Sequence, residues 1–532
     1  MNESLSWDLP YTSQRMPVLA DNMVCTSQPL ASAAGLRLLA NGGNAVDAAI
    51  GAAITLTVVE PCMNGIGGDS FALVWDGSGL HGLNASGRAP RRWTREHFAQ
   101  YSAMPVRGWD SVTVPGAVSG WRELSQRFGA LPFGDLFESA IRYARDGYLV
   151  SPTVSRQWEE QMPDIGDMPE FAGAFARGGR APSPGERFVC AGQAATLEAI
   201  AKSGGEAFYH GPIAAAIAAH ARATGGLIDE TDLAGHTADW VEPISSCYRD
   251  VELHEIGPNG QGIAALIALG ILDKAGLDVP ELDSTAFYHH QIEAMKLAFA
   301  DVYRYVGDPA AMRTVTADQL LEPDYLRQRA GLIEPGAARF PGPGKPHTGG
   351  TVYLTTADKS GIMVSLIQSN YLGFGSGIVV PDTGIALQNR GAGFNLVQGH
   401  PNEVGPGKRP FHTIIPGFLT RGGKPLMSFG VMGGSMQAQG HVQVTSRIAD
   451  FRQNPQAVVD APRWRIMDDN ATVSVEWNFP QTAIAGLTKL GHKVVVAARF
   501  ASGFGGSQAI MCLGEGYLGA SDHRKDGQAV GF

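Results

Sequence analysis

Gly349-Gly-Thr-Val-Tyr-Leu-Thr-Thr-Ala-Asp358 is the most informative stretch of this chain. Thr351 follows two glycines and opens a run of alternating β-branched and apolar residues, which predicts a strand that starts just after a flexible peptide bond. The preceding segment, Pro335–Gly350, is dense in Gly and Pro and has no hydrophobic period, so we expect a loop there. Taken alone, ten such residues most often form only a turn and a strand start.

A threonine in this setting can also cut its own chain. Attack of the Thr351 hydroxyl on the Gly350 carbonyl, an N-to-O acyl shift and hydrolysis would leave Thr351 as a new N-terminus. Its free α-amino group, with an ordinary pKa of roughly 8, could then accept the hydroxyl proton near neutral pH. This hypothesis divides the chain into a large subunit, residues 1–350, and a small catalytic subunit, residues 351–532, which begins with its nucleophile.

Glycine-rich motifs extend the pattern in both directions from Thr351. In chain order they are Asn41–Ala49, Asn64–Asp69, Asp358–Gly361, Gly373–Gly377, Gly405–Pro410, Gly433–Ser435 and Gly519–Arg524. Together they resemble the γ-glutamyltranspeptidase family of N-terminal-nucleophile hydrolases, over almost the whole chain. The resemblance implies self-processing at Gly350–Thr351 and an α/β fold, namely a four-layer αββα sandwich of two interwoven subunits.

The resemblance also assigns four catalytic positions. Thr351 is the nucleophile, Ser369 stands where the family has a supporting threonine, and the amides of Gly433 and Gly434 match the family's oxyanion donors. Consecutive glycines suit that task, because two backbone N–H groups reach one oxygen only where side chains do not crowd it. On their own residues, Ser369 also fits a solvent-facing strand serine, and Gly433-Gly434 fits an ordinary turn.

The substrate pocket departs from the family pattern. Where the family has a carboxylate-binding arginine this chain has Ser86, and Arg88 lies two residues later. Gly393 replaces the acid that holds the substrate's α-ammonium group, and Arg390 replaces a neutral amide. Loss of an acid together with gain of an arginine makes a zwitterionic amino-acid head group an unsuitable substrate.

Further departures surround these positions. Tyr371 replaces an asparagine that assists amino-acid binding, and His412-Thr413 replaces a pair of serines. His412 is a candidate pocket residue, a titrating partner or a core histidine, and the sequence leaves these readings open. The stretch Phe394–Gly405 is too short for the family's long lid.

These features favour an amidohydrolase or acylase that acts on a small acid amide such as oxamate, or on a dicarboxylic acyl side chain. Arg88 and Arg390 are the candidates that would grip the carboxylate bidentately, although each is also compatible with a structural ion pair. A glutathione hydrolase and γ-glutamyltransferase is one alternative. An uncleaved, non-catalytic scaffold is the other.

Composition limits the classes of partner. The 532 residues are 44% hydrophobic and 17% charged with a net charge of −10, and no block of like charges is present, so nucleic acid and anionic membranes are poor partners. The first ten residues lack the basic and apolar regions of a signal peptide, and the apolar Ala45–Val59 is too short to span a bilayer, so we expect a buried helix and a cytoplasmic protein. The expected partners are a small-molecule substrate and the two subunits of one precursor, with a dimer of heterodimers compatible with this.

No metal or other cofactor is expected. The five cysteines are odd in number and scattered, without a CxxC pair, which indicates reduced core thiols. His289-His290 and Glu293 have ligand spacing on a helix, but a third ligand is missing, so a helix-face contact is the preferred interpretation. Pro258–Gly262 lacks the strand-to-helix context of a phosphate loop and is expected to line the cleft.

Overall fold

The hairpin of strands β10 (Gly350–Ala357) and β11 (Met363–Tyr371), which carries Thr351 and is here called the nucleophile hairpin, forms the centre of the fold. The computed structural model describes residues 13–334, 336, 338, 350–499 and 501–532. Strand β10 pairs antiparallel with β11, as the alternating pattern after Thr351 predicted. They lie at the middle of a seven-stranded sheet, here called the nucleophile sheet, of order β21-β2-β10-β11-β3-β4-β7. Its other strands are β2 (Met23–Thr26), β3 (Asp69–Trp75), β4 (Leu80–Ala85), β7 (Asp239–Val241) and β21 (Gln528–Gly531).

A second seven-stranded sheet, here called the facing sheet, packs against the first. Its order is β1-β20-β19-β15-β14-β9-β8. The strands are β1 (Val18–Ala20), β8 (Ile244–Tyr248), β9 (Val251–Glu255), β14 (Gly417–Arg421), β15 (Lys424–Val431), β19 (Ser507–Cys512) and β20 (Tyr517–Ser521). Strands β10 and β11 contact β15 and β19 across the interface, so the hairpin is buried on both faces.

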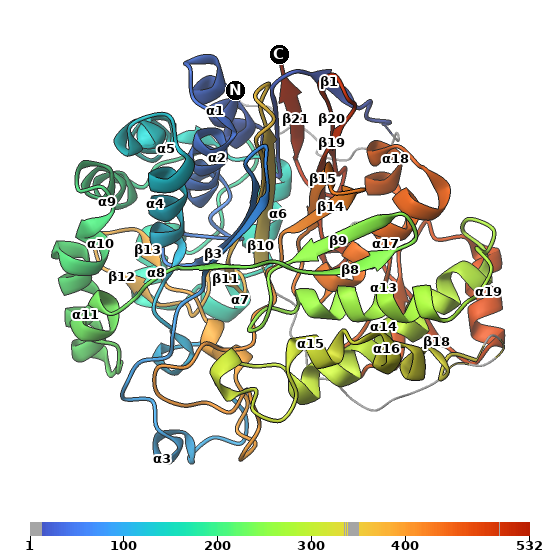
Figure 1. Cartoon of the computed structure of the whole chain (residues 1–532). Coiled ribbons are helices and arrows are strands. Elements are labelled where there is room, and N and C mark those ends of the chain that lie inside the picture. Colours follow the sequence, from blue (N-terminus) through green and yellow to red (C-terminus); the bar gives the residue numbers. More distant parts are fainter. Residues whose placement is uncertain (1–12, 335, 337, 339–349, 500) are drawn as a thin grey trace.

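Helices cover the outer face of each sheet, which confirms the predicted αββα sandwich (Figure 1). On the nucleophile sheet lie α1 (Pro29–Ala40), α2 (Ala45–Val59) and α4 (Ala117–Phe128), with α5 (Glu138–Asp146) and α9 (Ala191–Lys202) outside them. On the facing sheet lie α13 (Gly262–Lys274), α17 (Met436–Phe451) and α18 (Pro455–Asp460), with α14 (Thr285–Tyr305) packed on α13.

The remaining elements, most of them short, lie around this core. The helices are α3 (Arg95–Phe98), α6 (Pro152–Glu159), α7 (Met162–Ile165), α8 (Pro169–Phe175), α10 (Glu206–His210), α11 (Pro212–Thr224), α12 (Glu230–Ala234), α15 (Ala317–Leu320), α16 (Pro323–Ala330) and α19 (Gln481–Lys489). The strands are β5 (Tyr148–Leu149), β6 (Arg187–Phe188), β12 (Val379–Val380), β13 (Ile385–Ala386), β16 (Trp464–Ile466), β17 (Thr472–Val475) and β18 (Lys493–Val496).

Helix α2 is buried along its whole length, as its apolar sequence predicted. It begins with a capping box, in which the side chain of Asn44 accepts from the amides of Val46 and Asp47, and Asp47 accepts from the amide of Asn44. Contacts with β10 and β11 fix the helix against the nucleophile hairpin. Within the described residues no helix has the length and hydropathy to cross a bilayer.

Close packing of the two sheets depends on a glycine. A Cβ atom on Gly430 of β15 would lie 2.4 Å from ring atoms of Tyr353 on β10. Tyr353 is buried, and its hydroxyl is 2.7 Å from the hydroxyl of Ser365. Only a residue without a side chain therefore lets β15 approach β10 at this point.

Residues 110–310 have a mostly helical sequence pattern, and helices α4–α14 lie there, but strands interrupt them. Three strands lie there between residues 239 and 255, and β8 and β9 complete the facing sheet. Val251–Glu255 alternates between buried and half-buried residues, a period of two that could have identified it. The loop expected over Pro335–Gly350 lies almost wholly outside the described residues, and Gly350 itself is in β10.

All five cysteines are free. Cys25, Cys62 and Cys190 are buried, as expected of core thiols. Cys247 is exposed and Cys512 half-buried, so the expectation of core thiols was wrong for Cys247.

Candidate active site

Thr351 and Ser369 face each other at the end of the nucleophile hairpin. The regular pairing of β10 and β11 shifts between Gly350 and Val352, so Thr351 lies at an irregularity of the ladder. Both hydroxyl side chains are buried, and Thr351 Oγ1 donates to Ser369 Oγ over 3.2 Å. Ser369 is therefore not a solvent-facing strand residue.

Ser369 Oγ is the centre of a compact hydrogen-bond network. It donates to the carbonyl oxygen of Gly350 over 2.5 Å and accepts from the amide of Tyr371 over 2.8 Å. It also accepts from Arg390 Nη2 over 3.2 Å. The carbonyl that precedes Thr351 thus receives a hydroxyl donor, which is the interaction that stabilises negative charge on that oxygen during attack.

Arg390 is fully buried beside this network. Its Nη1 donates to Thr413 Oγ1 over 2.8 Å, and its Cζ lies 4.4 Å from the ring centroid of Tyr371, a cation–π contact. Its Nε has no hydrogen-bond partner among the described residues. Burial lowers the pKa of Arg390 to about 10, and the nearby carboxylate of Asp69 opposes this, so the guanidinium keeps its charge at neutral pH.

Asp69 supplies the countercharge, and sequence reasoning gave it no role. Its Oδ1 accepts from the amides of Gly87 and Gly116 and from Gln388 Nε2, each over 3.0 Å. Burial raises the pKa of Asp69 to about 6, and the charge of Arg390 opposes that rise. The available signal was its place at the end of the motif Asn64–Asp69, just before a strand.

His412 lies against Asp69 and is fully buried. Its Nε2 is 3.1 Å from Asp69 Oδ2, and its Nδ1 accepts from the amide of Ile414 over 3.3 Å, so Nε2 carries the proton. Burial together with Arg390 and Arg409 holds the pKa of His412 well below its ordinary value. This neutral histidine orients the segment that carries Thr413.

Gly433 and Gly434 lie between the end of β15 and the start of α17. Their φ angles of 122° and 61° lie in the left-handed region, which favours glycine. Neither amide N–H has a hydrogen-bond partner in the part of the chain that the structure describes. Gln261 Nε2 donates to the carbonyl oxygens of both Thr413 and Gly434, over 2.5 and 2.8 Å, and so joins the glycine pair to the Arg390 network.

The loop Pro258–Gly262, predicted to line the cleft, thus lies among the candidate residues. Hydrogen bonds join Thr351, Ser369, Tyr371, Arg390 and Thr413 into one network. His412 precedes Thr413 in the chain, and Gln261 links Gly434 to Thr413.

Arg88 lies outside this network. It is half-exposed, donates to the carbonyl oxygen of Gly407 over 3.3 Å, and is 3.7 Å from a carboxylate oxygen of each of Asp239 and Asp308. Its guanidinium group therefore lies close to two carboxylates.

His289, on helix α14, has in the structure the third neighbouring ligand that could not be identified in the sequence. Ligand atoms of His289, Glu293 and His492 lie within 4.8 Å of one another in the core. His289 Nδ1 is 2.8 Å from His492 Nε2, while Lys296 Nζ lies 3.1 Å from Glu293 Oε1 and 3.3 Å from His492 Nδ1. The ammonium group already supplies a cation beside the carboxylate, so the cluster is a buried polar network with a lysine at its centre.

Comparison with known proteins gives consistent matches. The family model for gamma-glutamyltranspeptidase matches residues 31–532. The chain is 38% identical to the glutathione hydrolase-like YwrD proenzyme of Bacillus subtilis (96% of this chain, 98% of that one) and 36% identical to the oxamate amidohydrolase proenzyme of Klebsiella pneumoniae (97% and 99%). The crystal structure of a cephalosporin acylase from Bacillus halodurans superposes with a TM-score of 0.94 at 46% identity, over 100% of this chain and 99% of that one.

Proposed function

Because the chain belongs to the γ-glutamyltranspeptidase family, we propose that it is a self-processing amidohydrolase that cleaves the amide of a small carboxylate-bearing acyl group such as oxamate. Processing between Gly350 and Thr351 would give subunits 1–350 and 351–532. The similarity to an oxamate amidohydrolase proenzyme and to acylases supports this reaction class.

The single observation that carries the substrate class is the buried guanidinium of Arg390. Its Nη2 and Thr351 Oγ1 both bond to Ser369 Oγ, so they lie no more than two hydrogen-bond lengths apart. Its Nε, unpartnered among the described residues, is a donor that a substrate carboxylate would satisfy. Asp69 already supplies a countercharge for Arg390, but the buried Nε–H still lacks an acceptor among the described residues, and a donor left unpaired inside a protein is costly.

The short distance also limits the acyl chain. In an oxamate-like acyl group the carboxylate is bonded directly to the carbonyl carbon under attack. Each added methylene would carry the carboxylate about 1.3 Å further from Thr351 when extended, as the covalent dimensions of a carbon chain dictate. Arg390 therefore supports a two- to three-carbon acyl group better than a glutaryl group.

Family membership and these contacts support the following mechanism. In the processed protein the Thr351 amine takes the hydroxyl proton while Oγ1 attacks the amide carbon, and the Gly433 and Gly434 amides hold the oxyanion. Collapse breaks the C–N bond, the proton passes to the leaving amine, and an ester on Thr351 remains. Water, deprotonated by the same amine, then attacks the ester and releases the acid.

A glutathione hydrolase is the second candidate, because one relative is described as glutathione hydrolase-like. At Gly393, where the family acid would stand, a Cβ atom would lie 2.5 Å from the carbonyl oxygen of Phe411. An acidic side chain has no room there. The backbone thus argues against a site for the α-ammonium group of a γ-glutamyl substrate.

Intact mass spectrometry of the wild type beside Thr351→Ala tests the processing. We expect two fragments that split at Gly350–Thr351 and a single 56.3 kDa chain in the variant. Product release is then measured on oxamate, on its homologues with one to three methylenes, and on a γ-glutamyl anilide. Preference for the longest homologue or for the anilide would reject the assignment to Arg390, and an uncut wild type would favour a non-catalytic scaffold.

A further inference from the structure

Gln261, in the loop Pro258–Gly262, has no part in the mechanism above. Its side chain is fully buried, and its Nε2 donates to the carbonyl oxygens of Thr413 and Gly434 over 2.5 and 2.8 Å. A backbone carbonyl oxygen can only accept, so the amide nitrogen of Gln261 faces both oxygens and uses both of its hydrogens. One side chain therefore holds together the two backbone segments that carry Thr413 and Gly434.

The peptide groups on both sides of Gly434 are held through their carbonyl oxygens. The oxygen of Gly433 accepts from the amide of Met436 over 3.1 Å. The oxygen of Gly434 accepts from the amide of Gln437 over 3.2 Å and from Gln261 Nε2 over the shorter distance of 2.8 Å. Each peptide group is planar, so its carbonyl oxygen sets the orientation of the whole group.

Gly434 itself offers little resistance to rotation. Its φ of 61° lies in the left-handed region, and it has no side chain to restrict φ and ψ. The direction of its N–H therefore depends on the two peptide planes that flank it. Without Gln261, the second of these planes would be held only by the longer bond from the first turn of α17.

The other carbonyl that Gln261 binds belongs to the Arg390 network. The hydroxyl of Thr413 accepts from Arg390 Nη1 over 2.8 Å. Because the carbonyl oxygens of Thr413 and Gly434 bond to the same nitrogen, they lie within two hydrogen-bond lengths of each other. Gln261 thus fixes the candidate oxyanion donor relative to the guanidinium that would bind the substrate carboxylate.

The loop that carries Gln261 is itself held in place. The amide of Gln261 donates to the carbonyl oxygen of His412 over 2.8 Å, and the amide of His412 donates to that of Asn259 over 2.9 Å. Glu255, at the end of β9 just before the loop, is hydrogen-bonded to Nδ1 of the buried His441 on α17. These contacts give Gln261 the rigid support that precise positioning requires.

We propose that Gln261 is a positioning residue for turnover, which aims the Gly434 amide at the oxyanion and sets its distance from Arg390. This inference rests on the proposed function, because it takes the glycine amides as the oxyanion donors. Such a donor is effective only when its N–H points at the position that the oxyanion will occupy. Gln261 would act through Gly434 and would not touch the substrate.

Self-cleavage and turnover separate this role from a purely structural one. In the uncut chain the carbonyl oxygen of Gly350 accepts from Ser369 Oγ over 2.5 Å, so this oxygen has a donor outside the glycine pair. A residue that only keeps the protein folded would affect cleavage and turnover alike. Gln261 should affect turnover alone.

Gln261→Met keeps the length of the side chain and removes both donated hydrogen bonds, and Gln193→Met is the matched control. Gln193 is a buried residue of α9, and its Nε2 also donates to a backbone carbonyl oxygen, that of Thr57, over 2.9 Å. We expect both variants to cleave themselves at the wild-type rate, as followed on a denaturing gel.

Ammonia release from oxamate then measures turnover. In Gln261→Met, kcat should fall on the order of tenfold with KM unchanged, because the negative oxygen develops only on the way to the transition state. The fall should be smaller than the roughly 10²-fold or more that outright loss of an oxyanion donor costs. The control variant should keep the wild-type kcat.

Gln261→Glu has nearly the same shape, with an oxygen in place of the donor nitrogen, and it decides the question if Gln261→Met does not fold. A wild-type kcat in a folded variant would overturn the inference. A change in KM alone, or loss of cleavage and turnover by the same factor in both variants, would also overturn it.

An activated ester keeps this test independent of the assigned substrate. If the cleaved wild type does not hydrolyse oxamate, the proposed acyl group is wrong, and 4-nitrophenyl acetate replaces it. Thr351 Oγ1 would attack the ester carbonyl, its proton would pass to the Thr351 amine, and 4-nitrophenolate would leave, with acetyl-Thr351 as the product. Release slowed about tenfold in Gln261→Met would support the positioning role. Equal rates, or no reaction of the wild type, would overturn it.

Discussion

At the scale of single residues, Ser369 connects the hydroxyl of Thr351 with the carbonyl oxygen of Gly350. Ser369→Ala should slow self-cleavage on the order of 10²-fold, since loss of one donor to a developing oxyanion costs about 3 kcal/mol. Ser369→Thr keeps the hydroxyl and should restore most of the rate. The fraction of cleaved chain is followed on a denaturing gel after rapid purification. Equal rates in all three proteins would remove Ser369 from the mechanism.

The pH profile of kcat/KM should show a second ionisation near pH 6, which is that of the Asp69 carboxyl group. Since Oδ1 accepts three donors, a proton would enter on Oδ2 and face the Nε2–H of His412. Burial raises the pKa of Asp69 to about 6, so log kcat/KM should steepen below that pH. Asp69→Asn places an amide N–H in the same position at every pH, so we expect a lower kcat/KM without the extra slope.

The free energy of unfolding should change with pH in the opposite direction from kcat/KM. Because the pKa of Asp69 in the folded protein is raised by burial above its unfolded value near 4, the folded state binds the proton more tightly. The free energy of unfolding of the wild type, relative to Asp69→Asn, should therefore fall as the pH rises from about 4 to about 6. Urea titrations at a series of pH values measure the difference, and a constant difference would contradict the raised pKa.

The residues that contact Ser369 had been singled out as candidates from the sequence, because motifs of the family mark those positions. It gave no role to Asp69, since its importance arises from the buried Arg390 nearby, and burial of a charge pair is a tertiary property. Arg88 and Arg390 were indistinguishable as cations in the sequence. Only the fold shows one fully buried beside Ser369 and the other half-exposed among acids.

At the scale of elements, Gly430 controls how closely β15 approaches β10. Gly430→Ala would force its Cβ atom into the ring of Tyr353, and overpacking of this kind typically costs 1–3 kcal/mol, so we expect a loss of about 2 kcal/mol in the free energy of unfolding. Self-cleavage should slow as well, because Tyr353 is two residues from Thr351. Gly79→Ala, whose Cβ atom would meet nothing within 4 Å, is the matched control. The stability of both variants is measured by urea denaturation in the Thr351→Ala background, and their self-cleavage is followed on a denaturing gel in proteins that keep Thr351.

Elements with a strong period could be predicted, and short ones could not. The apolar run Ala45–Val59 indicates helix α2, and the turn signal Asp76-Gly-Ser-Gly79 between two strand-like runs indicates the hairpin β3–β4. Strands β7 and β8, of three and five residues, are mostly half-buried at the edges of their sheets, where neither alternation nor burial leaves a strong pattern.

At the scale of the whole molecule, the two proposed subunits share both sheets. Strand β2 of the first subunit lies between β21 and β10 of the second, and β11 pairs with β3. We expect the cleaved subunits to elute together in gel filtration and to unfold in one urea transition, since neither buries its strands alone. Separately expressed subunits should not fold. Dissociation without denaturant would contradict this arrangement.

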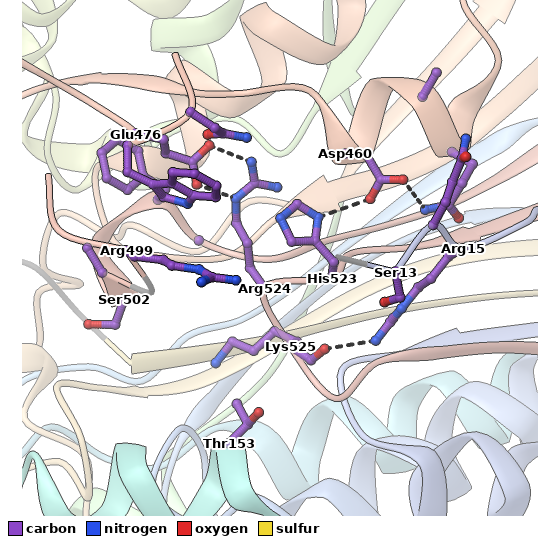
Figure 2. A pocket seen from close by; sticks show the side chains of 18 of the residues that line it. Ser13, Arg15, Thr153, Asp460, Glu476, Arg499, Ser502, His523, Arg524 and Lys525 are labelled. Carbon is purple, nitrogen blue, oxygen red and sulfur yellow. Dashed lines mark hydrogen bonds and ion pairs between the residues drawn. The ribbon is translucent and has the colours of Figure 1, made fainter. Parts of the chain in front are cut away.

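The αββα architecture itself was predictable, because it depends on the order of long motifs along the whole chain. The cavity of about 840 Å³ drawn in Figure 2 was not, since its walls come from residues 13–17, 152–157, 454–460, 476–478, 498–499, 501–505 and 523–525, which no local pattern joins.

Near the ends of the chain, Asn22 and Phe532 exchange backbone hydrogen bonds of 3.0 and 3.2 Å as β2 and β21 run side by side. That closeness makes a circular permutant feasible, in which a linker joins the old ends and translation starts with Met before Thr351. Removal of the initiator methionine would expose the threonine amine without any N-to-O shift. Such a protein would have the nucleophile from birth, so substitutions that block maturation, Ser369→Ala among them, could be assayed for turnover alone.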